Sequence, residues 1–136
     1  MTESRAEMPI FAKTYDFLAW LVLLTNNFPR AQRYAVTQRL LDAALDYLER
    51  LVEANAVRGA TRMKLLEAAD AEMGKVRLYL RLAHHWRWIT SGQYEHAGRL
   101  IAELGRLLGG WQKVTRQQSA SGSASASEAP SVVGAG

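Results

Sequence analysis

The sequence predicts an all-α protein, an up-down-up-down antiparallel four-helix bundle followed by a disordered C-terminal tail. Apolar residues recur at helical spacing in four segments of the 136-residue chain, and short polar breaks separate the segments. Short connections make successive helices antiparallel neighbours. Hydrophobic residues form 49% of the chain, enough for one core. We expect a flexible N-terminus over residues 1–8, the bundle over 9–113, and a disordered tail rich in Ser, Ala and Gly over 114–136.

The first two helices are expected at 9–25 and at about 30–54. Pro29 separates them, because proline disfavours helix at the residue before it and suits the first turn of the next helix. The apolar stripe predicted for the first helix consists of Phe11, Tyr15, Leu18, Val22 and Thr25. The stripe predicted for the second consists of Leu41, Leu45, Leu48 and Val52, widened by Val36, Leu40, Ala44, Tyr47 and Leu51.

The third and fourth helices are expected at about 61–89 and 93–111. The residues predicted to be buried on the third are Leu66, Ala69, Met73, Val76, Leu80 and Ala83, and its apolar side is extended by Tyr79, Leu82, Trp86 and Ile89. Those predicted to be buried on the fourth are Tyr94, Ala97, Ile101, Leu104, Leu108 and Trp111. Between the two helices, Thr90 and Ser91 are both candidates for the N-cap.

Several classes of function find no support in the sequence. There is no cysteine, and the adjacent His84 and His85 diverge by about 100° on a helix. The Glu-x-x-His pattern of helical metal sites, the serine elbow and the phosphate-binding glycine loop are all missing. We therefore expect no enzyme, no metal and no cofactor. The most apolar run, at 17–25, is too short to span a bilayer, and the start lacks the features of a signal peptide, so a cytoplasmic location is expected.

One face of the third helix is a candidate nucleic-acid surface. Arg77, Arg81, His84 and Trp88 share it, at i, i+4, i+7 and i+11. Three further residues flank the face: Lys75, His85 and Arg87. Guanidinium groups beside an aromatic ring suit phosphate contact and base stacking, and the net charge of +4 agrees with an anionic partner. The alternative is a solvated basic face on which Trp88 closes the helix end.

Small residues form a second stripe, on the fourth helix. Gly98, Ala102, Gly105 and Gly109 also fall at i, i+4, i+7 and i+11. Each glycine inside a helix costs about 1 kcal/mol relative to alanine, so the stripe needs a compensating contact. A small-residue face lets another backbone approach closely. The approaching element is either a helix of the same bundle or one of a second subunit, and we favour an oligomer interface.

Three stretches of the chain resemble one protein family. They are FPRAQRYAVTQRLLDAALDYLERLVEANA (28–56), KLLEAADAEMGKVRLYLRLAHHW (64–86) and ELGRLLGGWQK (103–113). Together they resemble the accessory variability determinant (Avd) family of diversity-generating retroelements. The residues that carry the signature are the Phe28-Pro29-Arg30 turn and the ending Leu108-Gly109-Gly110-Trp111. Related four-helix proteins encoded in intervening sequences of bacterial 23S ribosomal RNA share the Phe-Pro turn.

The resemblance implies a role that the spacing of residues does not provide. It implies a barrel-like homopentamer with a basic surface, which binds the reverse transcriptase of the element and its template-repeat RNA and so supports mutagenic cDNA synthesis. The alternative is a four-helix protein that binds structured RNA, of the ribosomal intervening-sequence type, without a polymerase partner. A third hypothesis is a structural assembly protein whose charge serves solubility.

Overall fold

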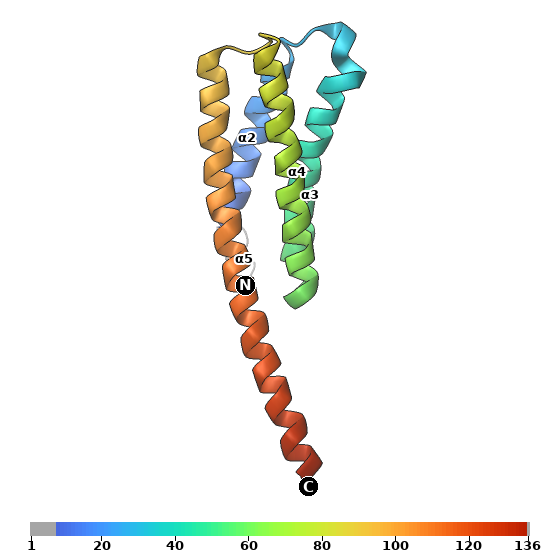
Figure 1. The fold of residues 1–136 in the computed structure, drawn as a ribbon, viewed down its shortest axis with the longest axis vertical. Coiled ribbons are helices and arrows are strands. Elements are labelled where there is room, and N and C mark those ends of the chain that lie inside the picture. Colours follow the sequence, from blue (N-terminus) through green and yellow to red (C-terminus); the bar gives the residue numbers. More distant parts are fainter. Residues whose placement is uncertain (1–7, 136) are drawn as a thin grey trace.

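The four predicted helices form an up-down-up-down bundle (Figure 1). A computed structural model describes the backbone of residues 8–135 and the side chains of residues 8–121. The α-helices are α2 (Pro9–Thr25), α3 (Gln38–Asn55), α4 (Gly59–His85) and α5 (Ser91–Ala135). They contact one another in a ring, α2 with α3, α3 with α4, α4 with α5, and α5 with α2. The α2/α3 edge of the bundle is therefore opposite the α4/α5 edge, and the predicted fold class is confirmed.

The connection between α2 and α3 is less regular than predicted. After Pro29 the chain forms a 3₁₀ turn (Arg30–Gln32) and a π-helical turn (Arg33–Thr37), and regular α-helix begins only at Gln38. Neither turn contains a buried residue. Because tertiary packing supplies most of the stability of a helix in a protein, this uncovered segment is not held in α geometry.

The turn between α4 and α5 is defined by two specific motifs. Helix α4 ends at His85, four residues before its predicted end, and Arg87 adopts a left-handed conformation with φ of 62°. Thr90 then caps α5: its Oγ1 accepts from the backbone N of Gln93 at 3.0 Å, while its own N donates to Oε1 of Gln93 at 2.9 Å. This reciprocal capping box selects Thr90 from the two predicted cap residues.

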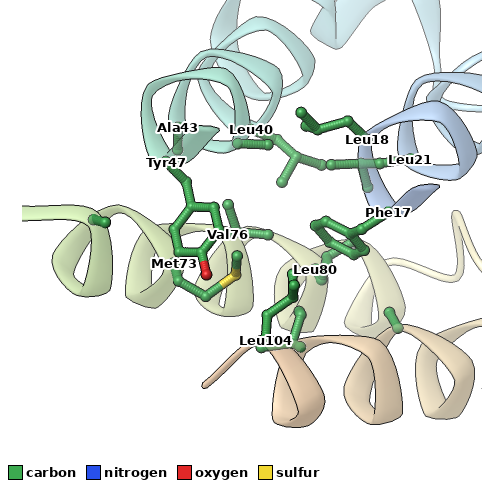
Figure 2. Packing of buried hydrophobic residues seen from close by; sticks show 14 of the residues in the cluster. Phe17, Leu18, Leu21, Leu40, Ala43, Tyr47, Met73, Val76, Leu80 and Leu104 are labelled. Atoms are coloured by element: carbon green, nitrogen blue, oxygen red, sulfur yellow. The ribbon is translucent and has the colours of Figure 1, made fainter. Parts of the chain in front are cut away.

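The core lies between the four helices and confirms the stripes predicted for α4 and α5. All six residues predicted to be buried on α4 are at most 2% exposed, and on α5 only Tyr94 is partly exposed. In Figure 2, Tyr47 reaches from α3 towards Met73 of α4, among leucines of the other helices. Burial raises the pKa of Tyr47 well above its usual value; the Thr14 hydroxyl opposes this shift. Neither hydroxyl has a hydrogen-bond partner of good geometry among the described residues.

The apolar faces predicted for α2 and α3 are partly wrong. Tyr15 and Val22 of α2 are 70% and 45% exposed, and Leu45 and Val52 of α3 are 44% and 55% exposed. The residues that α2 and α3 bury instead are Ile10, Thr14, Phe17, Leu18, Leu21, Leu24 and Thr25, and Leu40, Ala43, Ala44, Tyr47, Leu51 and Ala54. Both helices carry more apolar residues than one face can hold, so periodicity alone does not select the face that is buried.

The last helix continues beyond its predicted end at Trp111 and projects past the other helices (Figure 1). Thr115 is 1% exposed, and its Oγ1 donates to the carbonyl oxygen of Trp111 at 2.8 Å. Packing thus extends beyond the predicted boundary at Lys113, because no glycine or proline interrupts residues 112–121. Residues 1–7 and the side chains of 122–136 lie outside the described part, so the flexible N-terminus and the disordered tail stay predictions.

Candidate functional site

The predicted basic residues of α4 do not form one surface. Lys75 lies within 3.4 Å of Glu72, and helical spacing places it about 160° from Arg77. His84 is half-buried, because its ring stacks on Tyr94 at 4.4 Å and its Nε2 lies 3.2 Å from Oγ of Ser91. The exposed basic residues of the predicted set on this side are Arg77, Arg81, His85 and Arg87.

The basic stripe of α4 meets the small-residue stripe of α5. An Nη atom of Arg77 lies 3.6 Å from the position that a Cβ of Gly105 would occupy. Arg77 and Leu80 line a shallow groove between α4 and α5 together with Tyr94, Glu95, Ala97, Gly98, Ile101 and Ala102. We call this surface the α4/α5 groove. The basic stripe and the small-residue stripe, which the sequence predicts separately, are therefore adjacent parts of one surface.

The small-residue stripe faces outwards. No atom lies within 4 Å of a Cβ built on Gly98 or Gly109, once the backbone of the helix itself is set aside. Ala102 is exposed, and Gly105 meets only the end of the flexible Arg77 side chain. The close approach of another helix is thus not made within the described bundle, and the stripe is open at its surface.

The turn after α4 contains an aromatic stack that sequence reasoning only partly identified. Trp88 is half-buried, with its ring centroid 5.3 Å from that of Phe28 and 4.9 Å from that of Trp86. Trp86, which was expected on the apolar side of the helix, is 46% exposed. Trp86 is the C-cap of α4, where its N still donates to the carbonyl oxygen of Leu82 at 2.9 Å and no further helical turn follows. The sequence signal that could have indicated this aromatic cluster is the stretch HHWRW (84–88), which has two tryptophans in three residues.

The Phe28-Pro29-Arg30 signature lies at the same end of the bundle. Phe28 is buried and contacts Trp88, which holds the start of the α2–α3 connection against the end of α4. Arg30, Arg33 and Tyr34 follow on the exposed turns, Tyr34 with 76% of its surface accessible. Sequence reasoning assigned Arg30 to the family signature and gave Arg33 no role.

The exposed apolar residues of α2 and α3 form a second groove, on the opposite edge of the bundle. Val22, Leu41 and Leu45 line it together, and Tyr15 and Val52 continue the rows at seven-residue spacing. We call Tyr15, Val22, Leu41, Leu45 and Val52 the α2/α3 seam. The acidic side chains of Asp42 and Glu49 lie beside Leu45 on α3, at i−3 and i+4.

The Leu108-Gly109-Gly110-Trp111 ending belongs to the other end of the bundle. Leu108 is buried, and the Trp111 ring meets Phe11 of α2 edge-on at 5.9 Å. The guanidinium carbon of Arg62 lies 5.6 Å from the centroid of the Trp111 ring. Trp111 thus joins α2, α4 and α5, a structural reason for an aromatic anchor there.

No cluster in the described residues has the composition of a metal site, since His, Asp and Glu do not gather there in groups of three or more. The helices in the described part include none that is both long and apolar enough to cross a membrane. The described residues form two opposed grooves along the bundle and an end that is rich in basic and aromatic side chains.

These features define a class of protein, a small four-helix bundle with the fold of the S23 ribosomal protein family. A solved structure of a protein of unknown function from that family, from Bacteroides thetaiotaomicron VPI-5482, matches with a TM-score of 0.69 and 22% identity over 76% of this chain and 95% of that chain. The family model described as bAvd-like matches residues 8–115, and the chain belongs to this family. Comparison with curated proteins gives no match.

Proposed function

We propose that this chain is the non-enzymatic accessory protein of a diversity-generating retroelement and acts in the cytoplasm. The observation that carries the proposal is the bAvd-like match, which spans residues 8–115 and so includes both signature motifs. In this role the protein binds the reverse transcriptase of the element together with its template-repeat RNA or cDNA, and supports mutagenic reverse transcription.

The exposed cations support the nucleic-acid part of the proposal. Arg81, His85 and Arg87 lie with Trp86 and Trp88 towards one end of the bundle, and Arg30 and Arg33 follow the Phe28 contact with Trp88. Phosphate neutralisation by such a surface makes binding salt-dependent and nearly independent of sequence. The affinity of the wild-type protein for RNA is therefore expected to fall steeply between about 50 and 200 mM salt.

The two grooves support assembly into a homo-oligomer. The α2/α3 seam presents bulky apolar side chains and acidic neighbours, whereas the α4/α5 groove presents glycines together with Arg77. Arg77, with Arg81 one helical turn further on, provides cations for Asp42 and Glu49 of the next protomer. Because the two surfaces lie on opposite edges, we propose head-to-tail contacts, which close into a ring when the rotation between protomers permits it. A homopentamer is the ring that membership of the Avd family suggests.

Mixing two variants tests the head-to-tail contact. Leu45→Glu damages the seam and Gly98→Leu fills the groove; both sites are exposed, so each protomer should fold. Each variant alone should be monomeric by light scattering, whereas an equimolar mixture should form a heterodimer through the one intact pair of surfaces. Assembly of Leu45→Glu by itself, or absence of any association in the mixture, would contradict the contact.

Co-purification tests the function as a whole. The wild-type protein should retain the reverse transcriptase of its element on an affinity column and give a scattering mass of five protomers. Binding of structured RNA without retention of the polymerase would instead support the alternative, an RNA-binding protein of the ribosomal intervening-sequence type. A protein that binds neither RNA at low salt nor the polymerase would overturn both.

A further inference from the structure

Arg87 occupies a backbone position that normally belongs to glycine. Its φ is 62°, and the turn around it is a Schellman motif: the N of Trp88 donates to the carbonyl oxygen of Ala83 at 2.8 Å and the N of Arg87 to that of His84 at 3.0 Å. The left-handed conformation is unfavourable for a residue with a Cβ. Folding of the turn therefore does not explain the arginine, and a strained residue of this kind suggests a role in binding.

The exposed ring of Trp86, which precedes Arg87 in the chain, packs against a further aromatic ring, that of Trp88. The rings form a tilted cluster that runs from buried Phe28 through half-buried Trp88 to Trp86, with centroid distances of 5.3 and 4.9 Å and interplanar angles of 51° and 34°. Trp86 keeps 46% of its surface exposed, so part of the indole remains open to a further ring. Because the two inner rings support it, little freedom is lost when a planar group stacks on it.

The surface beside Trp88, whose ring contacts that of Trp86, favours an anion. A hollow there is lined by His84, His85, Arg87, Ile89, Thr90 and Ser91 together with Trp88, and no carboxylate is among them. A flat aromatic face beside cations is the combination by which proteins bind unpaired nucleotides, the base on the ring and the phosphate on the cation. Bases in a duplex are stacked on one another and do not offer a free face.

We propose that Trp86 and Arg87 form a binding site for an unpaired nucleotide of single-stranded nucleic acid. The base stacks on the exposed part of Trp86, and the guanidinium of Arg87 binds the adjacent phosphate, with His85 beside it. Arg87 directly follows Trp86 in the chain, and both side chains are exposed. This inference rests on the nucleic-acid part of the proposed function and adds to it a preference for unpaired strands.

The test compares a labelled single-stranded oligouridylate with an RNA duplex of the same length, at one salt concentration. Trp86→Ala should weaken binding of the single strand about 5- to 150-fold, and Trp86→Phe should restore most of it. Duplex affinity should change less than about twofold, because phosphate contacts dominate there. Arg58→Ala, which removes an exposed arginine at the start of α4, at the opposite end of that helix, serves as the charge control and should leave the preference unchanged.

Arg87→Gly provides a second, independent measurement. It should lower single-strand affinity and reduce the salt slope by about 0.7, the loss of one phosphate contact. Its Tm should be unchanged or higher by up to about 4 °C, because glycine adopts the left-handed turn without strain. A purely structural residue would show the opposite pattern, a lower Tm with unchanged binding.

The outcomes separate this site from the wider proposal. If the wild-type protein binds no RNA, the proposed nucleic-acid function fails. If it binds RNA and Trp86→Ala binds the single strand equally well, or loses single strand and duplex alike, the site is overturned while that function stands. If Trp86→Ala keeps RNA affinity and loses only the polymerase, the surface is a protein contact and the inference is wrong.

Discussion

Gly109 and Gly110 offer a matched pair of substitutions that separates helix stability from assembly. Both glycines lie inside α5, both are exposed, and no atom lies within 4 Å of a Cβ built on either. Gly109 belongs to the small-residue stripe, whereas Gly110 points about 100° away around the helix. Alanine at either position should therefore fit the protomer equally well.

Gly109→Ala should stabilise the protomer but weaken the contact between subunits. Replacing a glycine in a helix by alanine should raise the free energy of unfolding of the protomer by about 1 kcal/mol, or the Tm by about 4 °C, in both variants. At an interface where backbones approach closely, an added methyl group costs about 1–3 kcal/mol. Gly109→Ala should therefore weaken each subunit contact about 5- to 150-fold, while Gly110→Ala leaves it unchanged.

Sedimentation over a dilution series measures assembly, and urea unfolding at a concentration where the protein is monomeric measures the protomer. A more stable Gly109→Ala protomer that assembles as well as the Gly110→Ala protein would refute the assignment of the stripe to a subunit contact. A less stable Gly109→Ala protomer would refute the more basic conclusion that the stripe is open in the bundle.

Three further predictions concern the bundle itself. Tyr47→Phe removes a buried hydroxyl without a good partner and should raise the free energy of unfolding by about 1 kcal/mol. Because burial raises the pKa of Tyr47, the native state holds a proton that the unfolded chain releases above about pH 10. Wild-type stability should therefore fall as pH rises above that value, and Tyr47→Phe should lose less; equal slopes would contradict this. Trp111→Ala should cost about 3–5 kcal/mol in urea unfolding, and Trp111→Phe less; a cost below about 1 kcal/mol would show that the ring is no anchor. Thr90→Ala breaks the capping box and should cost about 1 kcal/mol relative to the wild-type protein in urea unfolding; a variant as stable as the wild type would contradict the cap.

Part of the structure could be predicted from residues that lie close together in the sequence. The buried faces of α4 and α5 followed from the helical spacing of their apolar residues. Thr90 was one of two candidate caps, with Ser91, because a hydroxyl residue is favoured at the N-cap. These features depend on residues close together in the chain.

The buried faces of α2 and α3 were predicted partly wrongly, because periodicity fits more than one face of each helix. Helices α2 and α3 each have apolar residues on more than one face, and the predicted stripes contained Tyr15 and Leu45, which are exposed. The choice between the faces depends on which neighbours complete the core, a property of the whole bundle. The rejected faces form the α2/α3 seam, so the errors of prediction mark a surface that remains uncovered in the protomer.

The sequence by itself determined four helical segments, their order, the breaks between them, and the signature that relates the chain to the bAvd-like family. Only the tertiary structure decided that Arg77 lies over Gly105, that the small-residue stripe faces outwards, and that Trp86 is the exposed end of a stack begun by Phe28. The physical reason is range: hydrogen bonds and periodicity act within a few residues, whereas these contacts join helices whose relative rotation is set by packing the whole core.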